Sequence, residues 1–279
     1  MKKVFLTYGT QEYASAVDRI CKQADSTHQF DVIKVYGPSN ISEEVKSSPL
    51  MAIKRGGGLW VWKPDVILKT IQLLQDGDYL VYCDAGCNIQ ACKEWTWYWN
   101  KLAKYDIIAQ RMYNRTDKWT RKEILDYFSH NKKGWSKNYQ YQATIVLKVT
   151  PFTRVFVREW RNIMLKHPEF VMDVTSDERK YQHKELIENR HDQAVYSALL
   201  YKYMSIPKYE KKILRVWERI EDLHPFRKQA IRATRQRNDV PETNKQKCIK
   251  MGKRLIKEYF LYPIVFTPLQ IINSKLEQE

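Results

Sequence analysis

Residues 4–9 read Val4-Phe5-Leu6-Thr7-Tyr8-Gly9, a short apolar run that ends in a polar turn. Such a run is typical of a buried strand and its exit loop. Residues 12–25 then carry apolar side chains at helical spacing, and residues 30–36 form a second apolar run closed by Gly37-Pro38. A strand–helix–strand opening favours a parallel, doubly wound sheet. The sequence therefore predicts an α/β fold.

The alternation of strands and helices continues along the chain. Apolar runs predict strands at residues 79–83, 107–109 and 141–149, and helical spacing predicts helices at 64–74, 120–128, 151–166 and 185–203. The last 70 residues are basic and look helical in segments. We therefore expect a domain over residues 1–205 and a basic helical region over residues 206–279, either part of that domain or an appendage.

Charge is high and unevenly placed in the 279-residue chain. The formal net charge is +16, and residues 207–257 hold 16 Lys/Arg against 6 Asp/Glu, a local net charge of +10. Such a surplus attracts anionic partners: nucleic acid, anionic lipid or nucleotide. Hydrophobic residues make up 43% of the chain, which predicts a globular protein rather than disorder.

Cysteines and apolar segments bear on the compartment. The five cysteines are odd in number, and their spacing suits neither a zinc ribbon nor a disulfide scaffold: Cys21, Cys83, Cys87, Cys92 and Cys248. We interpret them as structural thiols in a reducing compartment. The N-terminal apolar run is too short for a signal peptide, and no segment approaches the ~20 apolar residues of a membrane-spanning helix. A cytoplasmic protein is expected.

Residues 54–64 read Lys54-Arg55-Gly56-Gly57-Gly58-Leu59-Trp60-Val61-Trp62-Lys63-Pro64. Glycines let a backbone approach a ligand, cations complement phosphate, and tryptophans offer flat faces to a base or sugar. The stretch suggests a site for a phosphorylated, ring-containing ligand, with Trp62 and Pro64 anchoring its wall. The alternative is a basic surface turn before a helix with buried tryptophans.

Two carboxylates stand out beyond this stretch. Asp84 follows the apolar strand at 79–83, where open α/β sheets bind ligands, and it can hold Mg²⁺ or Mn²⁺ bridging two phosphates. Asp192, within Asn189-Arg190-His191-Asp192-Gln193, can act as a general base with Gln193 as a hydroxyl partner. Each has a simpler alternative, in which Asp84 caps a turn and Asp192 caps a helix.

The basic C-terminal region offers two further features. His224 can complete a metal site, and Arg227 and the arginines that follow can clamp a diphosphate, unless they belong to a solvated basic helix. Residues 248–260 predict a basic amphipathic helix, which can lie in an anionic membrane interface or pack on the domain.

Taken together, the motifs resemble those of bacterial GT-A glycosyltransferases encoded with capsule or lipopolysaccharide synthesis. The resemblance covers residues 1–200 and rests on R-G-x-G-x-W-x-W-K-P at 55–64, Y-x-D-A-G at 82–86, a Gln-containing strand at 140–149 and R-H-D-Q at 190–193. It implies a single GT-A-like, nucleotide-sugar-binding domain with a mixed, mostly parallel central sheet. The Y-x-D-A-G segment departs from Asp-x-Asp, because Ala85 and Gly86 replace the second carboxylate.

The resemblance also implies a reaction and roles for individual residues. The donor is expected to be a UDP-sugar, carrying a hexose such as galactose or galactofuranose, and the acceptor a saccharide or lipid-linked saccharide. Asp192 and Asp84 are the expected catalytic carboxylates, and Asp84 is an expected ligand of Mn²⁺ or Mg²⁺. His224, a second candidate metal ligand, and Arg227, a candidate for the diphosphate, lie beyond the matched residues 1–200. The residues expected around the nucleotide and donor sugar are Thr7, Tyr8, Gly9, Arg55, Gly58, Trp60, Lys63, Asp84, Gln142, His191, Gln193 and Arg227.

Two other functions fit parts of the sequence. A nucleic-acid-binding protein would explain the charge, but the sequence carries no helix-turn-helix, RNP aromatic motif or zinc finger, so no nucleic-acid partner is expected. A catalytically inactive nucleotide-sugar-binding module would bind UDP without turnover. The glycosyltransferase interpretation adds one further expectation: the basic C-terminal region holds the protein at the anionic inner face of the cell membrane.

Overall fold

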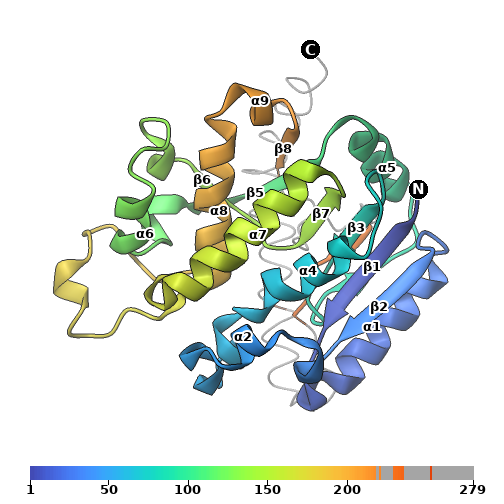
Figure 1. Cartoon of the computed structure of the whole chain (residues 1–279), viewed down its shortest axis with the longest axis horizontal. Helices are drawn as coiled ribbons and strands as arrows, with labels where there is room; N and C mark the ends of the chain where they lie inside the picture. The colour runs from blue at the N-terminus through green and yellow to red at the C-terminus, as the bar shows by residue number, and fades with distance from the viewer. Residues whose placement is uncertain (218–219, 221–228, 236–251, 253–279) are drawn as a thin grey trace.

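A seven-stranded sheet forms the centre of the computed structural model, which describes residues 1–217, 220, 229–235 and 252 (Figure 1). β2 pairs with β1, β1 with β3, β3 with β7 and β7 with β5, while β6 and β8 both pair with β5. The strands of this sheet are β1 Lys3–Tyr8, β2 Val32–Tyr36, β3 Tyr79–Tyr82, β5 Ile107–Arg115, β6 Tyr139–Tyr141, β7 Ile145–Lys148 and β8 Ile213–Trp217.

Strand direction makes the sheet mixed. β1 is parallel to both β2 and β3, and β8 is parallel to β5. β7 runs antiparallel to both β3 and β5, and β6 runs antiparallel to β5. β1, β2, β3, β5 and β8 therefore point one way, against β6 and β7. This confirms the predicted α/β fold with a mixed, mostly parallel central sheet.

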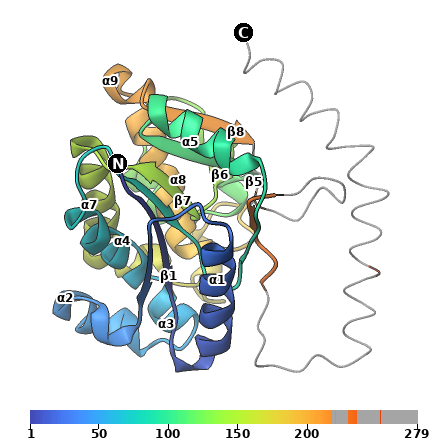
Figure 2. The same ribbon diagram turned by 90° about the vertical axis from the view of Figure 1, so that its right-hand side faces the viewer.

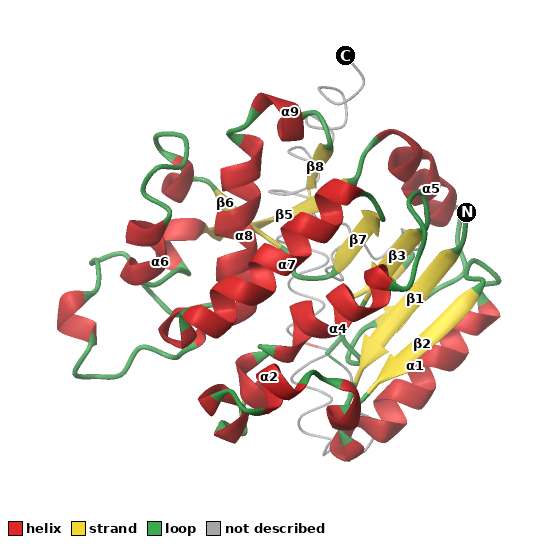
Figure 3. Cartoon of the chain, in the orientation of Figure 1, coloured by secondary structure: helices red, strands yellow, loops and turns green. Residues whose placement is uncertain are grey.

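Helices cover both faces of the sheet (Figures 2 and 3). One face carries α4 Trp62–Gln72, α7 Pro151–Lys166 and α8 His191–Met204, and the other carries α1 Ala14–Ser26 and α5 Glu94–Lys104. Shorter helices are α2 Glu43–Lys46, α3 Gly56–Leu59, α6 Lys122–Tyr127 and α9 Pro207–Glu210. The 3-10 turns are η1 Gln11–Tyr13, η2 Pro38–Asn40, η3 Pro49–Ala52, η4 Thr116–Lys118, η5 Trp135–Lys137, η6 Pro168–Val171 and η7 Arg179–Tyr181.

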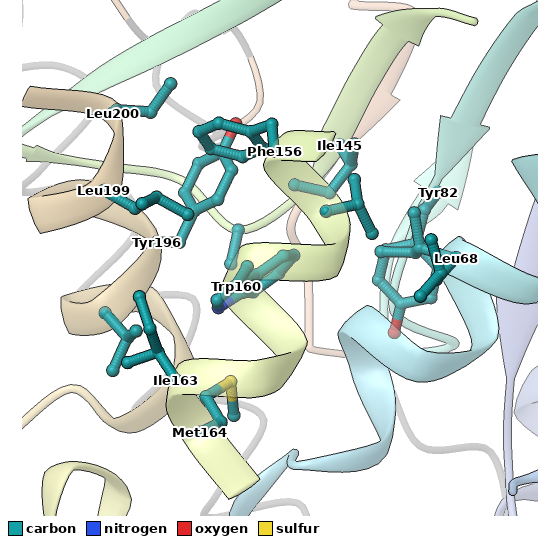
Figure 4. Close-up of a cluster of buried hydrophobic side chains, with 14 of the residues drawn as sticks. Leu68, Tyr82, Ile145, Phe156, Trp160, Ile163, Met164, Tyr196, Leu199 and Leu200 are labelled. Atoms are coloured by element: carbon teal, nitrogen blue, oxygen red, sulfur yellow. The ribbon is translucent and has the colours of Figure 1, made fainter. Parts of the chain in front are cut away.

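The larger core lies between the sheet and the layer of α4, α7 and α8 (Figure 4). Phe156 and Trp160 of α7 contact Tyr196 of α8, with ring centroids 5.7 and 5.0 Å away. Tyr82 of β3 is fully buried in the same core. Each apolar side chain of Phe or Leu size buried here contributes about 1.5–3 kcal/mol relative to an exposed one. This packing gives α4 and α8 fixed positions beside the end of β3.

The opposite face carries a smaller core beneath α1 and α5. Phe30 contacts Phe5, Trp95 and Trp99, with ring centroids 5.3, 5.0 and 5.9 Å away, respectively. Trp95 and Trp99 belong to α5, a helix that was not predicted from the sequence. Its run of aromatic residues carries helical spacing, since Trp95, Tyr98 and Leu102 are all buried.

The C-terminal region contributes strands where helices were expected. β8 lies within residues 206–279 and joins the sheet beside β5. A second strand, β9 Ile231–Arg232, pairs antiparallel with β4 Asn88–Ile89 in a two-stranded sheet. Buried and outward-facing positions alternate in part along Ile213–Trp217, which is a strand pattern. The expected amphipathic helix at 248–260 lies outside the described residues, apart from Gly252.

Four of the five cysteines lie within the described residues. Cys83 and Cys87 are buried, Cys21 and Cys92 are partly buried, and Cys248 lies outside the described residues. Within the part of the chain that the structure describes, no helix is both long enough and apolar enough to cross a membrane.

Candidate active site

The carboxyl ends of β1, β3, β5 and β8 share one edge of the sheet, because these strands run in the same direction. In open α/β sheets this edge is where ligands bind. Asp84 lies at this edge, immediately beyond β3. The Tyr82 hydroxyl donates a hydrogen bond of 2.6 Å to Asp84 Oδ1, so the carboxylate lies on the face covered by α4, α7 and α8.

Lys63 joins the two carboxylates that the sequence singled out. Its Nζ lies 2.7 Å from Asp192 Oδ2 and 3.3 Å from Asp84 Oδ1. The first turn of α4 supplies Lys63, the end of β3 supplies Asp84, and the first turn of α8 supplies Asp192. The side chains are 3%, 48% and 8% exposed, respectively, so only Asp84 presents much surface to solvent. We call these three residues the carboxylate–lysine cluster.

This geometry also decides the capping alternatives. α8 has Arg190 at its N-cap position, and no side chain of the described residues caps the helix there. The Asp192 carboxylate instead contacts Lys63, and the Asp84 carboxylate contacts Tyr82 and Lys63. Both carboxylates therefore contact Lys63, so neither aspartate acts only as a cap of a turn or of a helix.

Burial and charge set the ionisation of the cluster. Burial alone would lower the pKa of Lys63, but Asp192 and Asp84 together raise that pKa above its usual value. Burial raises the pKa of Asp192 above its usual value, and the neighbouring Lys63 ammonium opposes this increase. Burial and Asp84 raise the pKa of Tyr82, so its hydroxyl stays protonated and donates. Two carboxylates against one ammonium leave a net negative site when both are ionised.

The glycine-rich stretch, labelled α3, is a left-handed turn before α4 rather than a regular α-helix. Gly56, Gly57 and Gly58 have φ values of 61°, 57° and 99°, followed by 51° at Leu59 and 61° at Trp60. Residues other than glycine pay a steric cost in this region, and such strain concentrates at functional sites. At Gly58 a Cβ would also lie 2.6 Å from the Met51 sulfur. The glycines are therefore needed to turn the chain into α4 and so to place Lys63.

Both tryptophans of this stretch have defined partners. Trp62 is buried, stacks on Tyr8 with ring centroids 3.7 Å apart, and donates from Nε1 to the Gly56 carbonyl at 2.9 Å. It therefore anchors the turn, and the predicted role of this turn as the wall of a ligand site stays a prediction. Trp60 is half-buried, and its ring lies 5.2 Å from that of His191.

A second set of contacts joins the turn to the start of α8. Arg55 forms ion pairs with Asp173 at 2.7 Å and with Glu188 at 2.9 Å. Asp173 Oδ1 also lies 3.1 Å from Nε2 of His191. Burial lowers the pKa of His191 below its usual value, against the raising effect of Asp192 and Asp173. At neutral pH this histidine is therefore uncharged.

Thr7, Tyr8 and Gly9 lie where β1 meets its neighbours. The Thr7 hydroxyl is buried and donates to the Cys83 carbonyl at 2.9 Å. A Cβ at Gly9 would lie 2.4 Å from Val17 Cγ2, so glycine permits the close approach of α1. The Thr7 bond fixes the backbone just before Asp84, and Gly9 lets α1 pack close to the end of β1. Direct contact of the three residues with a nucleoside stays a prediction.

The predicted glutamines lie beside the start of α8. Gln193 donates from Nε2 to Gln140 Oε1 at 2.7 Å, and Gln140 donates to Thr120 Oγ1 at 2.9 Å. Gln142 is buried, and its backbone N–H donates to the Gln110 carbonyl at 2.8 Å in the break between β6 and β7. Gln140 thus links Gln193 to Thr120 in one hydrogen-bond network, although Gln142 and Gln193, and not Gln140, were the glutamines expected at the site.

Two more residues support the site without any signal in the sequence. Arg19 of α1 donates from Nη2 to the carbonyls of Ala85 at 2.7 Å and Cys87 at 3.0 Å, which holds the loop after Asp84. Asp173 bridges Arg55 and His191 from an irregular segment. Neither lies within a motif or at a periodic spacing, so only the fold reveals them.

The basic C-terminal region reaches the same loop. Thr234 Oγ1 donates to the Gly86 carbonyl at 3.1 Å and accepts from Asn88 Nδ2 at 2.6 Å. β9 therefore brings residues 229–235 to the edge that carries Asp84. His224 and Arg227, the expected metal ligand and diphosphate clamp, lie outside the described residues.

Within the described part of the chain, the side chains around Asp84 do not form a metal-binding group. Among the described residues no group of three or more His, Cys, Asp or Glu side chains could hold a metal ion. Asp84 Oδ1 already accepts from Tyr82 and contacts Lys63, and Asp192 contacts the same ammonium. The space between the two carboxylates thus holds a cationic side chain.

Similarity to known proteins is distant. No protein-family model matches the chain, and no curated protein matches it. Solved structures that resemble it include the galactosyltransferase LgtC in complex with donor and acceptor sugar analogs, at 13% identity over 80% of this chain and 76% of that one, with a TM-score of 0.41. The structure of an active-site mutant of LgtC gives 13% identity, 80% and 75% coverage, and a TM-score of 0.39.

A third solved structure is the glycosyltransferase GlyE of Streptococcus pneumoniae TIGR4. It is 10% identical over 96% of this chain and 53% of that chain, with a TM-score of 0.41.

Proposed function

We propose that this chain is a glycosyltransferase that moves a sugar from a nucleotide-sugar donor to a saccharide acceptor. The observation that carries the proposal is the carboxylate–lysine cluster, in which three motifs far apart in the sequence meet at the ligand-binding edge of the sheet. The resemblance of these motifs to those of GT-A glycosyltransferases supports the same activity. It also supports a UDP-linked hexose, such as galactose or galactofuranose, and a saccharide acceptor of cell-surface polysaccharide synthesis.

The charge of the cluster suits glycosyl transfer. An acceptor hydroxyl attacks the anomeric carbon, the bond to the nucleoside diphosphate breaks, and the ring gains positive character in the transition state. A preorganised negative site beside that ring stabilises the developing charge. Almost half of the Asp84 side chain is exposed, whereas Asp192 lies deeper, which supports our assignment of Asp84 as the carboxylate that faces the donor. We assign Asp192 as the acid/base or nucleophilic carboxylate.

A donor-hydrolysis screen tests the activity. Purified protein is incubated with UDP-, GDP- and CMP-sugars, and released nucleotide is measured beside the thermal shift caused by each free nucleotide. We expect release from at least one UDP-sugar and stabilisation by UDP. No release from any donor and no shift with UDP would contradict the proposal, whereas a shift without release would indicate a binding module that does not catalyse transfer.

A further inference from the structure

Lys63 is placed unlike a lysine that binds a substrate phosphate. Its side chain is 3% exposed, so it offers almost no surface to a ligand. An ammonium group has three N–H donors, and two carboxylates already lie within contact distance. Nζ also lies 5.6 Å from the centroid of the Tyr82 ring. Lys63 is therefore enclosed by the cluster rather than directed at a donor.

The position of Nζ is the one that a bridging cation would take. A divalent ion that bridges two carboxylates binds an oxygen of each, and here the ammonium contacts an oxygen of each. The ammonium cannot move aside without leaving Asp192 buried and unpaired, which is strongly unfavourable. Nor is it readily neutralised, since the two carboxylates raise the pKa of Lys63.

We propose that Lys63 is a built-in counter-ion of Asp84 and Asp192, and that the site works without a divalent metal between these carboxylates. The role of Lys63 in catalysis rests on the proposed glycosyl transfer, whereas the prediction that the site binds no divalent metal can be tested on its own. Lys63 is a positioning residue in this account: it holds Asp192 ionised and oriented, and it limits the negative charge beside the donor.

The negative charge of a departing diphosphate then has to be met by other cations. Residues 229–235 carry Arg232 and Arg235, and Thr234 ties this segment to the Gly86 carbonyl beside Asp84. Arginine matches diphosphate oxygens through paired hydrogen bonds. Within the described residues, this segment joins the basic C-terminal region to the loop after Asp84.

Manganese binding measured by electron paramagnetic resonance shows, without any enzyme assay, whether Lys63 or a divalent metal occupies the position between the two carboxylates. The full chain is titrated with Mn²⁺ as wild type, Lys63→Met and Asp84→Asn. We expect the wild type and Asp84→Asn to bind equally weakly, with dissociation constants above about 1 mM. Lys63→Met frees both carboxylates, so it should bind Mn²⁺ about tenfold or more tightly than the wild type.

Tight binding by the wild type that Asp84→Asn removes would overturn the inference. That comparison needs no Lys63 variant, so it holds even if Lys63→Met does not fold. Lys69→Met is the matched control on α4, because Lys69 donates to the Asn40 carbonyl rather than to the cluster. It should leave Mn²⁺ binding unchanged.

Turnover in the presence of a chelator gives the second readout. Once a donor is known, kcat/KM should change by less than about twofold between EDTA and added Mn²⁺. Loss of turnover in EDTA with recovery in Mn²⁺ would contradict metal independence while supporting the transferase. Absence of turnover in both conditions would count against the proposed function, and the Mn²⁺ titration would still decide the role of Lys63.

Discussion

At the scale of single residues, the pairing of Lys63 with Asp192 is what the sequence alone does not show. Both were singled out, Lys63 for a donor pocket and Asp192 for acid/base chemistry. Their 2.7 Å contact depends on how α4 and α8 pack on one face of the sheet. Each residue could therefore be singled out from its motif, but the contact between the two could not be predicted.

The raised pKa of Asp192 predicts where kcat/KM begins to fall on the acidic side, or acidic limb, of its pH profile. A base must be ionised, so kcat/KM should fall as pH decreases through this raised pKa. Lys63→Met removes the ammonium that opposes the increase, so the pKa of Asp192 should rise further and the limb should move to higher pH. Profiles of kcat/KM against pH for the two proteins check this. An unmoved limb in Lys63→Met would refute the coupling, and Lys69→Met serves as the control.

Tyr82→Phe tests the hydrogen bond to Asp84. The ring of Tyr82 is fully buried and would be retained, while the 2.6 Å bond to Asp84 Oδ1 is lost. We expect the free energy of unfolding in urea to decrease by about 0.5–1.5 kcal/mol, and donor turnover to fall because Asp84 is less well oriented. An unchanged turnover would show that this bond does not orient Asp84 for catalysis.

At the scale of elements, strands and helices with a strongly periodic sequence could be predicted, but the positions at which a strand breaks or a helix begins could not. β1, β3 and α7 match the expected segments closely. The strand expected at 141–149 is instead two strands, β6 and β7, and the break carries Gln142. The helix expected from residue 185 begins at His191, which has a φ of 50°. Breaks of this kind follow from tertiary contacts, which a local pattern does not contain.

The left-handed turn gives a prediction with a matched control. Gly58 and Gly77 have similar φ values of 99° and 97°, but only at Gly58 would a Cβ meet other atoms, with Met51 Sδ at 2.6 Å. Gly77→Ala should cost about 1–2 kcal/mol from backbone strain alone. Gly58→Ala should cost more and should also reduce turnover, because it displaces the turn that places Lys63. Urea denaturation of both variants checks this, and equal losses would contradict it.

At the scale of the whole molecule, the candidate site and the excess positive charge lie in different parts of the chain. The sheet and its two helical layers position the carboxylate–lysine cluster, whereas the local net charge of +10 over residues 207–257 belongs to the C-terminal region. β8 ties the start of this region into the sheet, and β9 ties a later part to the loop after Asp84. The sequence indicated the charge, but these two strands were not predicted within a region that looked helical.

We propose that the C-terminal charge holds the protein at an anionic membrane surface, where lipid-linked acceptors lie. Each Lys or Arg near such a surface contributes about 1 kcal/mol, and salt screens this attraction. The full chain should float with vesicles that contain anionic lipid, release at high salt, and stay behind with zwitterionic vesicles. Equal flotation with both kinds of vesicle, or with neither, would contradict electrostatic attachment.

Nucleotide release from a UDP-sugar by the wild type and by Asp192→Asn tests the central claim most directly. Asparagine keeps the size of Asp192 but cannot act as its carboxylate does. We predict that the wild type releases UDP and that the rate for Asp192→Asn falls by about 100-fold or more, while its circular dichroism spectrum stays that of a folded chain. A folded Asp192→Asn variant that releases UDP at the wild-type rate would contradict the account.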